Sequence, residues 1–179
     1  NGGEPPVTLR TLTSRALDLA FPATCVGCGR EGRPICASCE PALDVRLDRP
    51  AGVQIGLPGD LSDPLVQIDW CAPFTGLVRD ALHRLKYSGE RRLAVPLGTA
   101  IGRRWARVGA GGDLIVPVPV HRDRAAQRGY DQAVLLADSA ARALVLPMLV
   151  AAELAAVVAE AGRRFSVVNP TAASASACV

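Results

Sequence analysis

Four cysteines carry the most specific chemical signal in this sequence. Cys25 and Cys28 form one CxxC pair, Cys36 and Cys39 form a second, and seven residues separate the pairs. A tetrahedral structural Zn²⁺ takes four soft thiolate ligands, and two closely spaced CxxC pairs supply them. Four thiolates leave no open position for a substrate, so the spacing predicts a structural zinc. The alternative is two disulfides in a secreted domain.

A basic segment over residues 121–132 is the second candidate site. It follows an apolar run over 114–120, and open α/β sheets bind ligands at the carboxyl ends of their strands. Arginines offer forked donors for phosphate oxygens, a glycine lets the backbone approach a ligand, and a helix that begins near Asp131 favours anions at its N-terminus. An exposed, charge-balanced surface loop would have the same composition. The candidate residues are His121, Arg122, Arg124, Arg128, Gly129, Tyr130, Asp131 and Gln132.

Lys86 and Tyr87 close a predicted helix and are candidates for the same site. The alternative is that Lys86 only complements the negative C-terminal end of the helix dipole. His83 and His121 are too isolated in the sequence to be proposed as a catalytic or metal-binding pair.

The composition is that of an ordinary globular protein with an unevenly distributed charge. Apolar residues make up 49% and charged residues 21% of 179 residues, close to the averages for soluble domains. Residues 79–128 hold eleven Arg or Lys against four Asp or Glu, which indicates an anionic partner or simply the solvated faces of two helices. Six cysteines are too few for a disulfide scaffold, and no basic segment followed by an apolar run begins the sequence. We therefore expect a cytoplasmic protein.

The elements that would position these residues follow an α/β order. The patterns predict a helix over 9–20, a strand over 66–70, a helix over 77–85, a second helix from near Pro96, a strand over 114–120, a polar loop over 121–131 and a third helix after it. The second helix is expected to bury Leu97, Ile101, Trp105 and Val108, and the third Leu135, Leu136, Ala140 and Leu144. Such alternation is typical of α/β domains.

Taken together, these segments resemble the ComF family, bacterial competence-associated proteins with a phosphoribosyltransferase domain. The resemblance rests on Leu17-Asp-Leu-Ala-Phe-Pro, the CxxC pairs, Leu82-His-Arg-Leu-Lys-Tyr-Ser-Gly89, Val116-Pro-Val-Pro-Val-His-Arg122 and Arg128-Gly-Tyr-Asp-Gln-Ala133. It implies a zinc ribbon followed by a Rossmann-like type I phosphoribosyltransferase core. It also implies phosphoribosyl pyrophosphate with Mg²⁺ as the ligand, pyrophosphate contacts after Val-Pro-Val-Pro, and a mobile flap at Arg-Gly-Tyr-Asp-Gln.

On this basis the chain divides into an N-terminal helix with a zinc ribbon (1–45), a linker (46–64), the first part of a phosphoribosyltransferase-like domain (65–147) and an atypical Ala/Val-rich segment (148–179). The family carries two adjacent acids and a Thr/Gly-rich loop near its C-terminal end, which contact the ribose and the 5′-phosphate. This sequence has no adjacent acidic pair, and Gly162 is its only glycine after Gly129. A truncated or frame-altered family member and a divergent tail both account for this departure, and residues 166–179 are expected to form a small-residue tail.

Two functions of different classes follow from this sequence. The first is a ComF-like protein that binds phosphoribosyl pyrophosphate or a nucleotide, is linked to DNA uptake, and has lost or reduced transferase activity. The second is a non-catalytic zinc-containing module that binds single-stranded DNA or a competence helicase, with binding that weakens steeply with salt. A third reading is an inactive product of a defective reading frame.

Overall fold

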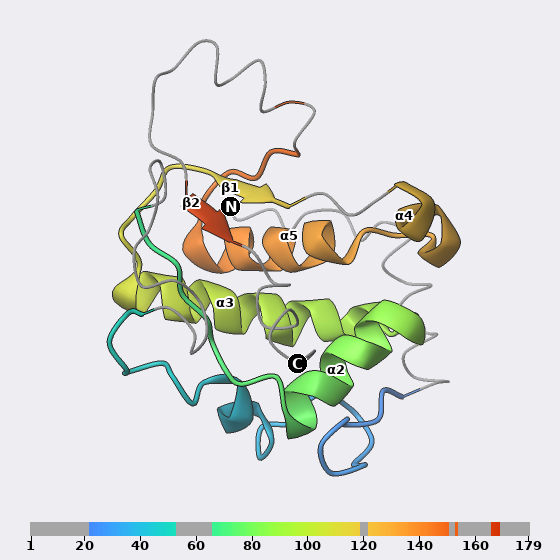
Figure 1. The fold of residues 1–179 in the computed structure, drawn as a ribbon. Helices are drawn as coiled ribbons and strands as arrows, with labels where there is room; N and C mark the ends of the chain where they lie inside the picture. The colour runs from blue at the N-terminus through green and yellow to red at the C-terminus, as the bar shows by residue number, and fades with distance from the viewer. Residues whose placement is uncertain (1–21, 53–65, 119–121, 151–152, 154–165, 169–179) are drawn as a thin grey trace, which may run out of the picture.

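The computed structural model describes residues 22–52, 66–118, 122–150, 153 and 166–168 (Figure 1). The helix predicted over 9–20 and His121 lie outside the described residues. The described elements are η1 (Glu40–Leu43), α2 (Gly76–Tyr87), η2 (Arg91–Leu93), α3 (Ala94–Val108), β1 (Ile115–Pro117), α4 (Arg122–Arg128), α5 (Gln132–Leu144) and β2 (Ser166–Val168). Helices thus combine with a short parallel sheet, which is a mixed α/β arrangement.

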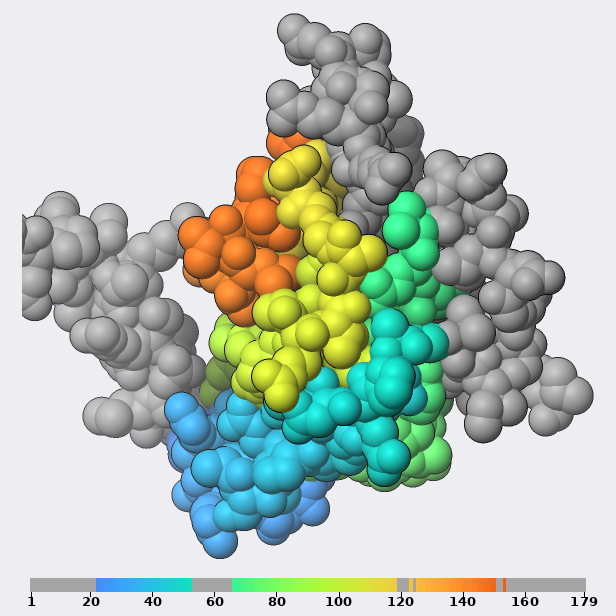
Figure 2. All heavy atoms as spheres, turned by 90° about the vertical axis from the view of Figure 1, so that its left-hand side faces the viewer, coloured from blue at the N-terminus to red at the C-terminus, as the bar shows by residue number. Residues whose placement is uncertain are grey.

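The helices and strands lie in successive layers. In Figure 1, α5 lies between the strands and α3, while α2 and the cysteine-bearing residues 22–52 lie on the other side of α3. Figure 2 shows these blue and cyan residues packed directly against the yellow-green part of the chain that contains α3. The main core joins α2, η2 and α3 with Ile35 and Leu43 from the cysteine segment. A smaller cluster joins Ile115 of β1 to α5.

Helices α3 and α5 approach closely because α3 presents glycines to its neighbour. A Cβ placed on Gly98 would lie 2.5 Å from the Leu136 carbonyl oxygen and 2.5 Å from the Ser139 Cβ. A Cβ on Gly102 would lie 2.7 Å from the Ala143 Cβ. Ile101, Trp105 and Val108, predicted to be buried, are only half-buried. That prediction was wrong because the buried surface of α3 includes these glycines and Arg104, which apolar periodicity does not count.

The strand β1 is paired on both sides. It runs parallel to β2, with Ile115 opposite Ser166. On its other side Ile115 forms a parallel bridge with Met148: the Ile115 N–H donates to the Pro147 oxygen over 2.9 Å, and the Leu149 N–H donates to the Ile115 oxygen over 3.0 Å. The strand is shorter than predicted and ends at Pro117, whose ring removes a donor. β2 was not predicted, since residues 166–179 were expected to form only a tail.

Two other element predictions were wrong. The strand predicted over 66–70 does not form, because this segment lies against α3, and a helix has no strand edge to pair with. Gln67 Nε2 donates to the Val108 oxygen of α3 over 3.1 Å. The Trp70 oxygen accepts from the Arg46 side chain (Nε, 3.2 Å) and not from a neighbouring strand. The polar loop predicted over 121–131 contains α4. Its Arg, Ala and Gln residues have high helix propensity, although they lack the apolar periodicity by which a helix is usually recognised.

A buried arginine of α3 binds residues 46–50, the first part of the segment that was predicted to be a linker. The side chain of Arg104 is 4% exposed and pairs with Asp69, which is 5% exposed, over 3.0 Å. The Arg104 guanidinium also donates to the carbonyl oxygens of Arg46, of Leu47 over 3.2 Å, of Arg49 over 2.6 Å and of Pro50 over 3.1 Å. Residues 46–50 are therefore packed on α3, so the cysteine segment and the helices share one interface.

We predict that Gly98→Ala destabilises the protein by about 1–3 kcal/mol, because the added methyl group overpacks the contact with α5. At an exposed helix position the same change would stabilise the protein by about 1 kcal/mol. A loss of stability would therefore indicate the close contact between α3 and α5. Val95→Ala is the matched control, since Val95 lies in the same helix and is 62% exposed. Urea unfolding of the three proteins measures the difference, and a Gly98→Ala variant as stable as the parent would contradict the close approach.

We predict that Arg104→Met lowers the free energy of unfolding by about 3–5 kcal/mol, because it removes the closest cationic partner of the buried Asp69 carboxylate and leaves only Arg46 at 3.6 Å. Arg103→Met is the control. Arg103 is 32% exposed and pairs with Glu40 over 3.0 Å and Asp44 over 2.8 Å, and ion pairs of this exposure contribute about 1 kcal/mol or less. Equal losses in the two variants, measured by chemical unfolding, would show that Arg104 does not hold the segment.

Candidate functional site

The four cysteines of the CxxC pairs converge on one point. Their sulfur atoms all lie within 4.8 Å of one another. An antiparallel bridge between Thr24 and Glu31 folds the first pair into a turn, within which the Cys25 N–H donates to the Arg30 oxygen over 2.8 Å. Gly29 adopts a φ of 75°, which a glycine tolerates without strain. The second pair lies in a turn in which the Cys39 N–H donates to the Cys36 oxygen over 2.9 Å.

The cluster has the dimensions of a tetrahedral metal site. Zn–S bonds of about 2.3 Å place sulfur atoms about 3.8 Å apart at the corners of a tetrahedron. The Cys28 and Cys36 sulfurs are 3.5 Å apart, and the Cys36 N–H donates to the Cys25 sulfur over 3.4 Å. All four cysteines are free thiols. The cluster is thus positioned to hold a metal ion.

The local environment differs from one thiol to another. Burial of Cys25 opposes ionisation, but backbone N–H groups of Cys36, Cys28 and Gly27 donate to its sulfur and lower its pKa to about 6. The hydrogen bond with Cys28 lowers the pKa of Cys36. Hydrogen bonding to Cys36 raises the pKa of Cys39 to about 12. A divalent cation would replace the thiol protons with one charge common to all four sulfurs.

The cysteine cluster packs directly against α2. A Cβ on Gly27 would lie 2.6 Å from the Leu77 Cδ1 and 2.9 Å from the Cys39 sulfur, so a larger residue at this position would displace Leu77 or Cys39. Ile35, next to Cys36, is 4% exposed and belongs to the main core. A metal held by these sulfurs would therefore also hold the N-terminal segment on the helices.

The second candidate site forms where α2 ends. Tyr87, the last residue of α2, is 71% exposed. The Arg128 guanidinium carbon lies 5.4 Å from the centre of the Tyr87 ring, and Arg128 Nη1 donates to Gln132 Oε1 over 2.8 Å. The Tyr130 hydroxyl donates to the Leu85 carbonyl oxygen. The structure thus brings Tyr87 together with residues 128–132, although about 40 positions separate them in the sequence.

The remaining predicted residues have different roles or positions. Asp131 is the N-cap of α5, and its carboxylate accepts from the N–H groups of Ala133 over 2.7 Å and Val134 over 3.3 Å. Lys86 is half-buried in the last turn of α2. Arg122 and Arg124 lie in α4, and their side chains, like all of His121, are outside the described part of the chain.

Sequence reasoning missed Arg91. Its guanidinium carbon lies 4.5 Å from the centre of the Tyr130 ring, and Nη2 donates to the Gly129 oxygen over 3.3 Å. Arg92 faces Glu90 over 2.7 Å, and hydrogen bonds from Arg92 lower the pKa of that carboxyl group. The only sequence signal for Arg91 is its place in the basic region after the turn that follows Tyr87, and that signal does not distinguish it from Arg92.

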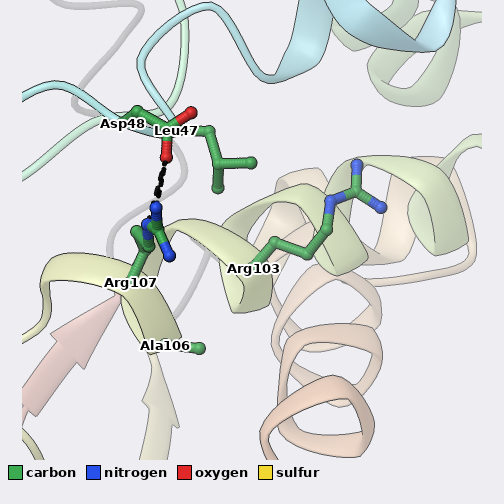
Figure 3. Close-up of a pocket in the computed structure, with 5 residues that line it drawn as sticks. All are labelled: Leu47, Asp48, Arg103, Ala106 and Arg107. Atoms are coloured by element: carbon green, nitrogen blue, oxygen red, sulfur yellow. Dashed lines mark hydrogen bonds and ion pairs between the residues drawn. The ribbon is translucent and has the colours of Figure 1, made fainter.

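A shallow hollow of about 520 Å³ lies elsewhere on α3, lined by Leu47, Asp48, Arg103, Ala106 and Arg107 (Figure 3). Arg107 points to Asp48 and pairs with it over 2.9 Å, and Arg103 pairs with two acids of the cysteine segment. Its cations are thus already neutralised, and none of the predicted site residues lines it.

Comparison of the chain with protein-family models, with curated proteins and with solved structures finds no match. Within the described residues, no helix has both the length and the apolar character that crossing a membrane requires.

We predict that the purified protein contains about one zinc ion per chain, and that Cys36→Ser loses it because three ligands remain. Cys71→Ser is the matched control: the Cys71 thiol is half-buried, lies apart from the cluster and donates weakly to the Ala100 oxygen over 3.9 Å. Elemental analysis and thermal unfolding with and without a chelator measure the effect. Equal metal content in the two variants, or none in the parent, would contradict the assignment.

Proposed function

We propose that this chain is a zinc-stabilised, ComF-like protein of the phosphoribosyltransferase type. It binds phosphoribosyl pyrophosphate or a nucleotide beside the end of α2. In this proposal the cysteine cluster holds a structural Zn²⁺ in a zinc ribbon, because four thiolates complete a tetrahedron and leave no position for a substrate. By the same resemblance, the protein acts in DNA uptake during competence, in the cytoplasm and alongside a helicase.

The observation that supports the proposal is the convergence of Tyr87, Arg91 and Arg128. Within the described residues, the contacts of Arg91 and Arg128 are with aromatic rings, a backbone carbonyl and an amide oxygen, and none is with a carboxylate. Both guanidinium groups therefore keep their charge available for phosphate oxygens. The exposed ring of Tyr87 offers its face to a ribose or a base.

The geometry around Gly129 favours close approach of a ligand. Gly129 has a φ of 71°, and the nearest atom to a Cβ placed on it is an Arg91 nitrogen at 3.6 Å. The Arg91 contacts with Gly129 and Tyr130 hold this segment against η2. We infer that Arg91 positions residues 128–130, while Arg128, which is held less closely to its aromatic neighbour, makes the main phosphate contact.

Binding is proposed here rather than efficient transfer. The sequence lacks the adjacent acids and the Thr/Gly-rich loop of the family it resembles. Within the described residues, the cysteine cluster is the only group of His, Cys, Asp or Glu arranged to hold a metal. Mg²⁺ therefore enters this proposal only with the pyrophosphate oxygens that it accompanies.

We predict that millimolar phosphoribosyl pyrophosphate with Mg²⁺ raises the melting temperature. At 100 times its Kd a ligand stabilises by about 2.7 kcal/mol, which corresponds to about 5–10 °C for a domain of this size. Arg128→Ala should weaken binding about 10- to 100-fold, the cost of one hydrogen bond to a charged group. Arg142→Ala is the control, because Arg142 is 79% exposed and pairs only with Asp138 on α5 among the described residues.

The same measurement separates the competing function. If a single-stranded oligonucleotide stabilises the chain and phosphoribosyl pyrophosphate does not, and if the effect weakens steeply with salt, then the protein is a nucleic-acid-binding module. The absence of any shift with either ligand would remove the binding proposal and leave the metal centre unaffected.

A further inference from the structure

The four cysteines of the metal centre are unequally exposed. Cys25 is 1% exposed, Cys36 is 7% exposed and Cys39 is half-buried, whereas Cys28 is exposed. The two glycines beside Cys28 also differ in how closely other atoms surround them. Gly27 faces Leu77 and Cys39, but a Cβ on Gly29 would have nothing within 4 Å. Cys28 is therefore the cluster cysteine most open to a small solute, on the side of the turn where Gly29 lies.

The exposed residue Cys28 has a close buried partner in Cys36. The Cys28 and Cys36 sulfurs are 3.5 Å apart and share a hydrogen bond. Formation of a disulfide of about 2.0 Å requires them to approach by about 1.5 Å. The two residues belong to different CxxC turns, so a bond between them would remove one ligand from each pair.

We propose that Cys28 is an oxidation site for hydrogen peroxide and that Cys36 resolves the oxidised sulfur. This inference rests on the proposed zinc centre and is independent of phosphate binding. Oxidation by peroxide would then weaken the packing of the N-terminal segment on α2.

The steps balance with peroxide as the only co-reactant. The Cys28 thiolate attacks one peroxide oxygen, the O–O bond breaks, and hydroxide leaves, so that Cys28 becomes a sulfenic acid. The Cys36 thiolate then attacks the Cys28 sulfur, the S–O bond breaks, and a second hydroxide leaves as the disulfide forms. Two thiolates lose two electrons, and one peroxide gains them. Cys25 and Cys39 alone cannot complete a tetrahedral site, so Zn²⁺ is released.

Release of the metal would loosen a defined part of the core. Cys36 follows Ile35, and both residues are buried in the segment that packs on α2. Gly27 allows the cluster to contact Leu77 of the same helix. Oxidation therefore should lower the melting temperature, and a dithiol with added Zn²⁺ should restore it.

The test treats the zinc-loaded full chain with hydrogen peroxide and follows zinc release with a chromophoric chelator and disulfides by peptide mass mapping. We expect about one zinc released per chain, a Cys28–Cys36 disulfide, and little oxidation of Cys71, whose pKa burial raises to about 12. A Cys28→His variant keeps a fourth zinc ligand but removes the exposed sulfur, and we expect zinc release at least about 10-fold slower. Cys39→His is the matched variant and should release zinc at the parental rate.

The outcomes are distinct. Zinc release at the parental rate from Cys28→His, or a first disulfide that omits Cys28, would overturn the inference. If neither histidine variant retains zinc, the parent protein is treated with peroxide and a reagent that reacts with sulfenic acids. An adduct on Cys28 supports the inference, and an adduct on another cluster cysteine overturns it. Zinc content is measured before peroxide is added, and a chain without zinc would overturn the metal centre itself.

Discussion

Four sulfur atoms within 4.8 Å of one another impose the main constraint on this structure. Hydrogen bonding to Cys36 raises the pKa of Cys39 to about 12. Thiolates at this distance experience a mutual repulsion unless protons or a cation lie between them. A tetrahedral divalent ion resolves it for all four sulfurs together. Because Gly27 and Ile35 seat the same turns on α2, the metal centre and the attachment of the N-terminal segment are one feature.

The basic site depends on a different part of the core. The Tyr130 hydroxyl bonds to the end of α2, and Arg91 bonds to Gly129. These contacts bring Arg128 to Tyr87, while the glycine contact between α3 and α5 sets the position of the helix that begins after Asp131. The cysteine cluster and the proposed anion site thus lie at opposite ends of α2, so each proposal can be tested without the other.

The helices were predictable where the apolar residues of the sequence pattern are the residues that the core buries. The apolar periodicity around Leu82 and Leu136 predicted α2 and α5, since both faces are buried in the core. The alternation over 66–70 predicted a strand, but there the polar residues bind α3, as the contact of Gln67 with Val108 shows. Helix α4 was missed because its residues have helix propensity without an apolar face. Arg91 could not be separated from Arg92 by sequence, since only the partners of each side chain distinguish a paired arginine from an available one.

By itself the sequence determined the metal-ligand set, because Cys25 to Cys39 span fifteen positions and local turns are sufficient to bring their sulfurs together. Only the tertiary structure decided which of these cysteines is exposed, that Arg104 is buried against residues 46–50, and that Tyr87 contacts Arg128. The physical reason is that burial and long-range contact depend on how closely α2, α3 and α5 pack, and the glycines that permit this packing have no side chain to appear in a hydrophobic pattern.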